Sequence, residues 1–330
     1  METVQNTNHE HNQDTALLNE ATSVMSTDGQ PLEEGPMSGR SAIRLAFKYL
    51  AYYFGLTIVG GVLILLPSFI LFGICGLCIP GASTWSLSDW SMSWFFIGSQ
   101  LLPLYVAWKR KWCDFGWKKT PHLGRLLLWM LVAWLAYTCI EVFFDQVFSL
   151  VGIDTNSQQS ILDGEILPLA LISISVLAPL TEEALFRGTI ERKMLASDRG
   201  PWFAIGVSAV LFALMHADVF VTSMTFMMGL FMGWIYYRTR NVWLTIILHA
   251  FNNTVSAIML LVTGTFDFVT DGAEADYPFY VYLAFLAVGL VLMCVAVSAI
   301  KRITARDDNT AQPGNNAGNT SINKPISLQD

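Results

Sequence analysis

The sequence predicts an all-α, polytopic membrane protein with about eight transmembrane helices. Of its 330 residues 53% are hydrophobic and only 14% are charged, and the mean hydropathy is +0.47. Soluble domains carry about 25% charged residues, so a bilayer is the expected solvent. The third observation is that apolar stretches recur at the length of about 20 residues that a helix needs to cross hydrocarbon.

Eight such stretches follow one another along the chain. Their expected ranges are 49–78, 90–108, 126–150, 166–187, 201–217, 219–237, 241–264 and 278–300. The first stretch is long enough to tilt or to bend at Pro67, because proline removes a helical hydrogen bond. We expect no cleavable signal peptide, because the first 44 residues are polar and acidic without an apolar core.

The ends of the chain differ in composition from the stretches between them. Residues 1–44 form an acidic tail, and 307–330 are rich in Asn, Gly, Ser and Thr. Such segments carry too little apolar surface to offset the entropy lost on ordering. The expected organisation is therefore a disordered tail at 1–44, one transmembrane domain at 45–306 and a second disordered tail at 307–330.

Lys and Arg residues fall in alternate loops, as the positive-inside rule requires of a multi-pass protein. Basic residues precede the first span and follow the second, fourth, sixth and eighth, at Arg40, Arg44, Lys48, six positions within 109–125, Arg192, Lys193, Arg199, Arg238, Arg240, Lys301, Arg302 and Arg306. The intervening loops near 79–89, 151–165, 218 and 265–277 contain no Lys or Arg. We therefore expect a protein of the cell (inner) membrane with both termini cytoplasmic. The net charge of −7 lies largely in tails and outer loops, and it does not indicate a nucleic-acid partner.

The fourth stretch ends in APLTEEALFRGTIERKML, which brings charged side chains to the cytoplasmic end of an apolar span. Glu183 and Arg187 are four residues apart, with the acid first, which is the favoured order for an ion pair on one helix face. Glu182 points about 100° away from that face and has no cation close in sequence. A desolvated carboxylate of this kind is a suitable general base.

Two of the five histidines, His216 and His249, fall in predicted spanning helices, while His9, His11 and His122 fall in a tail or a loop. The turn Ser197–Pro201 separates the fourth and fifth helices. Glu182 lies 17 residues before residue 199 and His216 lies 17 after it, so an antiparallel pair would bring both to one height. His249 and Asn253 are four residues apart and share one face of the seventh helix.

An acid, two imidazoles and an amide in a low-dielectric cavity suit the hydrolysis of an amide bond. In this interpretation Glu182 and His216 activate a water molecule, and His249 and Asn253 donate hydrogen bonds to the tetrahedral oxyanion. Glu182, His216 and His249 are also a common type of zinc ligand set. The sequence has no H-E-x-x-H motif, and it leaves open whether the cofactor is zinc or none.

Three segments, T-E-E-A-L-F-R at 181–187, F-A-L-M-H at 212–216 and H-A-F-N-N at 249–253, resemble the E-E-x-x-x-R, F-x-x-x-H and H-x-x-x-N motifs of the CAAX-protease and bacteriocin-processing (CPBP, or Abi) family. The order and spacing match, and the resemblance covers about 165–260. It implies that Glu182 is the catalytic glutamate, that Glu183 pairs with Arg187, that His216 orients water, and that His249 with Asn253 stabilise the oxyanion.

The resemblance implies an intramembrane endopeptidase that acts on a membrane-associated, hydrophobic or lipidated peptide, with membrane lipid as its other partner. Two alternatives remain from the sequence. The chain can be a noncatalytic scaffold or bacteriocin-immunity factor built on the same helices, or a transporter that relays protons through Glu182 and the histidines. Glu141 and Asp145, four apart in the third helix, are expected at an interface or facing water. The sequence identifies neither the substrate and its cleavage site nor the oligomeric state.

Overall fold

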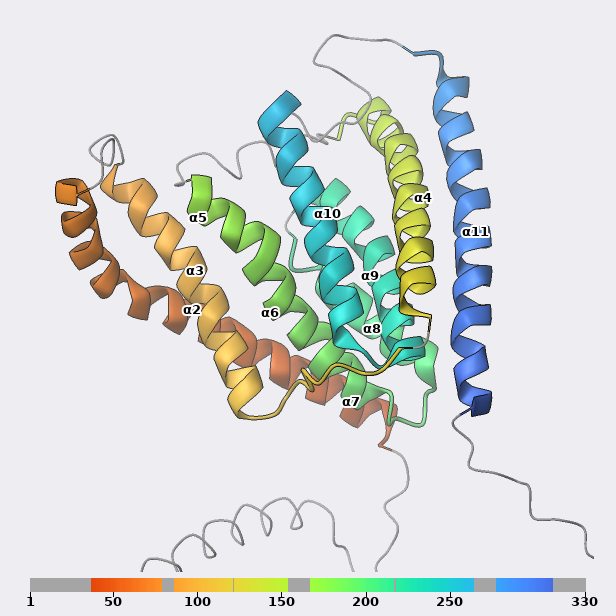
Figure 1. Cartoon of the computed structure of the whole chain (residues 1–330), viewed down its shortest axis with the longest axis horizontal. Helices are drawn as coiled ribbons and strands as arrows, with labels where there is room; N and C mark the ends of the chain where they lie inside the picture. Colours follow the sequence, from red (N-terminus) through yellow and green to blue (C-terminus); the bar gives the residue numbers. More distant parts are fainter. Residues whose placement is uncertain are drawn as a thin grey trace, which may run out of the picture.

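A computed structural model describes residues 37–78, 86–120, 122–153, 167–216, 218–263 and 277–310, most of them in helices (Figure 1). Most of the two predicted tails and of the loops near 79–89, 151–165 and 265–277 lies outside these ranges. The tail boundaries were placed too far inward, because helix already begins at Gly39 and the last helix runs to Thr310. At the first boundary Arg40, Ala42 and Arg44 favour helix despite their polar surroundings.

Each predicted span contains a helix, so the all-α class is confirmed. The helices are α2 (Gly39–Cys78), α3 (Leu87–Lys109), α4 (Leu123–Leu150), α5 (Leu167–Ile172), η3 (Ser173–Leu177), α6 (Ala178–Leu185), η4 (Phe186–Glu191), α7 (Arg192–Met194), α8 (Pro201–Ala213), α9 (Val219–Thr239), α10 (Val242–Thr263) and α11 (Phe279–Thr310). The segments from α5 to α7 follow one another without a break and form a single span, Leu167–Met194.

Within the described ranges, six spans are both long and apolar enough to cross a membrane: α2, α4, Leu167–Met194, α9, α10 and α11. The remaining two predicted spans differ from expectation. Helix α3 has 23 residues, but its serines, tryptophans and Asp89 lower its hydropathy. Helix α8 has only 13 residues, and at 1.5 Å per residue it is about 20 Å long.

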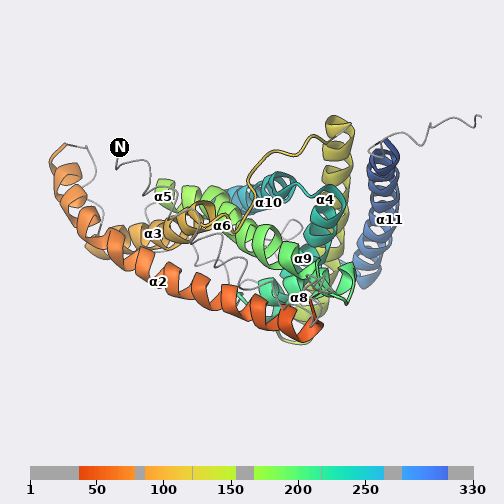
Figure 2. The ribbon, with the colours of Figure 1, turned by 90° about the horizontal axis from the view of Figure 1, so that it is seen from below.

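The helices form three groups, visible in Figure 1 from left to right. Helix α2 packs on α3, α8 packs on α9 within the central group that also holds Leu167–Met194 and α10, and α4 packs on α11. Figure 2 shows the same order from below, with α2 along one side and α11 at the far edge. Helices α2 and α3 approach closely where Gly60 meets Gly98, because a Cβ on either glycine would lie within 2.4 Å of the other's carbonyl oxygen.

The basic loops lie together at one end of the molecule. The amide of Asp198, between α7 and α8, donates to the carbonyl of Met37, just before α2, at 3.0 Å. Arg192 Nη2 donates to the carbonyl of Trp112 at 2.6 Å, and Asn241 Nδ2 donates to that of Lys118 at 3.1 Å. The segment 110–120 is therefore held against the helix ends by hydrogen bonds.

The span Leu167–Met194 contains two π-helical stretches that the hydropathy pattern does not predict. In η3 the amide of Ala178 bonds to the carbonyl of Ser173, five residues back. The next donor at this spacing would be Pro179, which has no N–H. The carbonyl of Ile174 is therefore left without a helical partner, and it is available to another side chain.

Candidate active site

Glu183 is the centre of a fully buried polar group. Its Oε1 accepts a hydrogen bond from Arg187 Nη1 at 2.8 Å, and His249 Nδ1 lies 2.9 Å from the same oxygen. Arg187 also donates to the carbonyl of Gly229 at 3.1 Å, and its guanidinium lies 4.4 Å from the centre of the Phe212 ring. The predicted ion pair is present, with 0% exposure of both side chains. The contact with His249 was not predicted.

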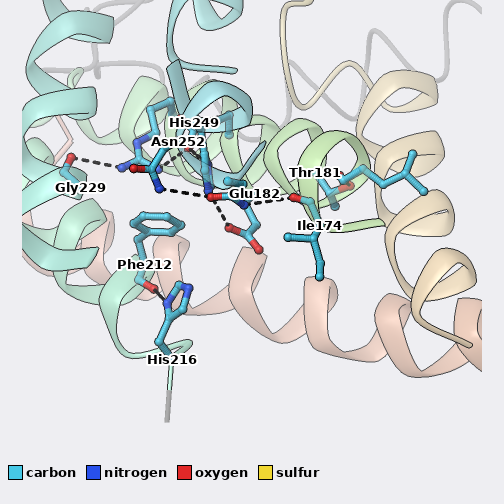
Figure 3. A network of polar contacts seen from close by, with 12 residues as sticks. Ile174, Thr181, Glu182, Phe212, His216, Gly229, His249 and Asn252 are labelled. Carbon is cyan, nitrogen blue, oxygen red and sulfur yellow. Dashed lines mark hydrogen bonds and ion pairs between the residues drawn. The ribbon is translucent and has the colours of Figure 1, made fainter. Parts of the chain in front are cut away.

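Glu182 lies on the other side of the same imidazole. His249 Nε2 is 3.8 Å from Glu182 Oε2, and the Glu182 side chain is 21% exposed, whereas Glu183 is fully buried. Figure 3 shows Glu182 facing His249, with Phe212 and His216 next to them. The side chains of the two adjacent glutamates therefore point in different directions, as their separation of about 100° around the helix predicts. Glu183 fixes the histidine ring, and Glu182 faces open space.

His216 lies just beyond α8, so its predicted position within a helix ending at residue 217 is wrong. The helix ends at Ala213, and Asp218 caps the next helix by accepting from the amide of Val221 at 2.8 Å. Because Asp218 must begin a new helix, the chain turns before it. His216 Nδ1 lies 3.3 Å from the carbonyl oxygen of Phe212. The Phe212 ring meets the rings of both His216 and His249 edge to face, at 5.6 Å between centres.

Asn253 is oriented by a chain of hydrogen bonds. Its Nδ2 donates to the carbonyl of Ile174 at 3.1 Å, which is the carbonyl that Pro179 leaves free. Its Oδ1 accepts from Asn252 Nδ2 at 3.4 Å, and Asn252 Oδ1 accepts from Trp134 Nε1 at 3.0 Å. Within the described ranges Asn253 Nδ2 has no other partner, so its second hydrogen can be donated to a ligand.

A cavity of about 310 Å³ joins these side chains. Helices α4, α6, α9 and α10, η3 and the end of α8 all contribute to its wall. It is lined by Tyr137, Glu141, Ile174, Ala178, Glu182, Phe212, His216, Phe220, Val221, Met224, Thr225, Met228, Met232, His249, Asn252, Asn253, Ser256, Ala257 and Leu260. All four residues that the sequence predicts as catalytic line this cavity, and Glu183 and Arg187 lie behind its wall.

Sequence reasoning missed three contributors to the site. Asn252 precedes the motif residue Asn253, and Pro179 lies three residues before Glu182. Both residues are near the motifs in the sequence, but no pattern predicts their contribution to the site. Trp134 lies in α4, far from any motif, and only the packing of α4 on α10 reveals its contact. Glu141 was expected to lie at an interface or face water, and it lines the cavity.

The zinc alternative concerns Glu182, His216 and His249. Among the residues that the structure describes, no three His, Cys, Asp or Glu side chains are grouped so that they could hold a metal ion. The zinc set therefore stays a prediction from the sequence.

Residues 164–255 match the model of a protein family described as type II CAAX prenyl endopeptidase Rce1-like. Two curated relatives are each similar to about a third of the chain. One is "Putative membrane peptidase YdiL" of Bacillus subtilis strain 168, which is 32% identical over 112 residues, covering 34% of this chain and 46% of YdiL. No solved structure matches significantly.

The second relative is "Membrane-embedded CAAX protease MroQ" of Staphylococcus aureus strain USA300. It is 25% identical over 127 residues, covering 37% of this chain and 51% of MroQ. The chain spans about half the length of the curated relatives it matches. The residues that match the family model contain Glu182, His216, His249 and Asn253, and α4 lies outside them. This multi-pass membrane protein is therefore similar, at residues 164–255, to the membrane CAAX proteases of the CPBP family.

Proposed function

We propose that this chain is an intramembrane endopeptidase that hydrolyses a peptide bond in a hydrophobic or membrane-associated peptide. The observation that carries the proposal is the surroundings of His249. Glu183 holds its Nδ1, and its Nε2 points into the cavity 3.8 Å from Glu182. An ion pair with a purely structural role would not need a second carboxylate on the cavity side of the ring.

In the proposed reaction Glu182 takes a proton from water as the water oxygen attacks the scissile carbonyl carbon. His216 orients that water molecule. The tetrahedral oxyanion accepts hydrogen bonds from Asn253 Nδ2 and from His249 Nε2 in its doubly protonated form, since Nδ1 already donates to Glu183. The intermediate collapses as the carbon–nitrogen bond breaks, and Glu182 returns its proton to the leaving amine.

Comparing new protein termini by mass spectrometry tests this proposal. Membranes containing the wild type are compared with membranes containing Glu182→Gln at the same protein level. We expect the termini to fall by at least about a hundredfold, because the amide cannot accept the proton. Asp198→Asn is the matched control, since it makes the same acid-to-amide change at an exposed turn away from the cavity.

Two other outcomes would redirect the assignment. If the termini do not change and Glu182→Gln retains biological activity, the chain acts as a scaffold or immunity factor. If a chelator abolishes the wild-type termini and added zinc restores them, Glu182, His216 and His249 are metal ligands. Termini that depend on Glu182 and are insensitive to the chelator support the metal-free route.

A further inference from the structure

A second carboxylate, Glu141, lines the cavity that contains Glu182. It belongs to α4, outside the region that matches the family. Tyr137, one turn earlier on the same helix, donates from its hydroxyl to Glu141 Oε1 at 3.4 Å. None of the described residues that line the cavity is Lys or Arg. Among the described residues the cavity wall therefore carries two carboxylates, Glu141 and Glu182, and two imidazoles, His216 and His249, but no Lys or Arg.

The distance along α4 between Glu141 and the level of Asn252 and Asn253 can be estimated from the contact of α4 with α10. Trp134 Nε1 donates to Asn252 Oδ1 at 3.0 Å, which brings Trp134 to the level of Asn252 and Asn253. Glu141 is seven residues further along α4, or about 10 Å along the helix axis. An extended peptide advances about 3.3 Å per residue, so this distance corresponds to about three residues.

Beyond Asn253, the cavity wall that α9 and α10 contribute is largely apolar. Helix α9 contributes Met224 and Met228, and α10 contributes Ser256 and Leu260. A charge is only weakly screened in such surroundings. A cation next to Glu141 is therefore favoured, and an anion at the same place is disfavoured.

We infer that Glu141 selects a peptide with a positive charge about three residues from the bond to be cleaved. That charge is a Lys or Arg side chain or a free α-amino terminus. The inference rests on the proposed function, because it takes the position of the scissile bond from Glu182, His249 and Asn253. Glu141 acts in this inference as a specificity-determining residue.

The test uses hydrophobic peptides that are identical except at the third residue on either side of the cleaved bond, where they carry Lys, Gln or Glu. For the wild type we expect kcat/KM to be about tenfold higher for Lys than for Glu, on one side of the bond. Glu141→Gln should remove most of this preference, and Glu141→Lys should reverse it. Acetylated and free amino termini distinguish an α-amino group from a side chain.

Asp145→Asn is the matched control, because it removes a carboxylate one turn further along α4, outside the cavity lining. Its ratio of Lys to Glu cleavage should equal the wild-type ratio. A wild type without charge preference, or a Lys preference that survives in Glu141→Lys, would overturn the inference.

Binding of the same peptides to Glu182→Gln separates this inference from the proposed function. This variant lacks the proposed base, so the order of affinity reports charge selection without turnover. If the wild type cleaves none of the peptides but binding to Glu182→Gln favours Lys, the hydrolysis proposal fails and the role of Glu141 stands. If the peptides are cleaved but neither binding nor cleavage depends on charge, the hydrolysis proposal stands and the role of Glu141 fails.

Discussion

At the scale of single residues, the orientation of one amide decides what the site can donate. The oxygen and nitrogen of Asn253 have similar shapes, and only their partners distinguish them. Asn252 donates to the oxygen, and the nitrogen donates to the carbonyl of Ile174. Trp134 in turn fixes Asn252. The nitrogen of Asn253 therefore keeps one hydrogen for the oxyanion of the proposed reaction.

Replacing Asn252 by Asp tests this orientation, because Asp still accepts from Trp134 but its carboxylate cannot donate to Asn253. We expect kcat to fall between about tenfold and a hundredfold, since small misplacements of a catalytic donor have effects of this size. KM should change little, because the cavity wall keeps its shape. Steady-state kinetics on a cleaved peptide measure both constants.

Trp134→Phe serves as the companion variant, because it retains the packing against Phe251 but loses the N–H group. It should lower kcat in the same direction and by a smaller factor. A normal kcat in both variants would show that Asn253 is held by Ile174 alone.

The division between Glu182 and Glu183 is predictable at the residue scale, because it depends only on the 100° per residue of a helix. The contact between Glu183 and His249 is not predictable in this way. It depends on how α10 is rotated relative to α6, and nothing in the spacing within either helix reports that rotation. Sequence therefore predicts the members of the site better than their pairing.

At the scale of elements, apolar length predicts the spans but not the details of the helices. The π-helical turns at η3 and η4 leave the hydropathy of the span unchanged, although Pro179 marks the first of them. The length of the apolar stretches also does not reveal that segment 110–120 packs against η4. Cys113 of this segment is buried against Gly188, and burial raises the pKa of its thiol to about 12.

The contact between Gly188 and Cys113 leads to a prediction of stability. A Cβ on Gly188 would lie 2.2 Å from Cys113 Sγ, so Gly188→Ala should lower the free energy of unfolding by about 1–3 kcal/mol. Cys113→Gly combined with Gly188→Ala should recover part of that loss, because it removes the opposing side chain. Thermal unfolding in detergent measures the change.

Gly206→Ala is the appropriate control, since a Cβ on this glycine of α8 meets no atom within 4 Å. Alanine there should be neutral or stabilising by up to about 1 kcal/mol, because it reduces the entropy of the unfolded chain. Equal unfolding temperatures for the two alanine variants would contradict the close contact at Gly188.

At the scale of the whole molecule, the family's region and the complete cavity are not the same set of helices. The described part of the matched residues, 167–216 and 218–255, lies in the central group, whereas Trp134, Tyr137 and Glu141 come from α4 in a flanking pair. The three motifs predict which helices of the central group carry the residues of the site. The contribution of α4 has no local motif, because it depends on packing between helices more than 100 residues apart in the chain.

Hydrogen bonds connect the basic loops at one end of the molecule. This arrangement supports the proposal that both termini and the turn 195–200 are cytoplasmic. The contact of Asp198 with Met37 means that this turn lies beside the start of α2. A reporter that is active only in the cytoplasm should therefore be active when fused after residue 198 and inactive when fused after residue 272. Activity at both positions would contradict the proposed orientation.

The buried charges of Leu167–Met194 also affect how the protein enters the bilayer. This span contains Glu182, Glu183, Arg187 and Glu191, and a charged side chain at the centre of an isolated helix costs about 2.5–3.5 kcal/mol during insertion. Phe212, Gly229 and His249 contact these charges, and the ribosome makes all three later. We therefore expect the nascent span to remain at the translocon until α8, α9 and α10 arrive, so that the four enter the lipid as one cooperative unit.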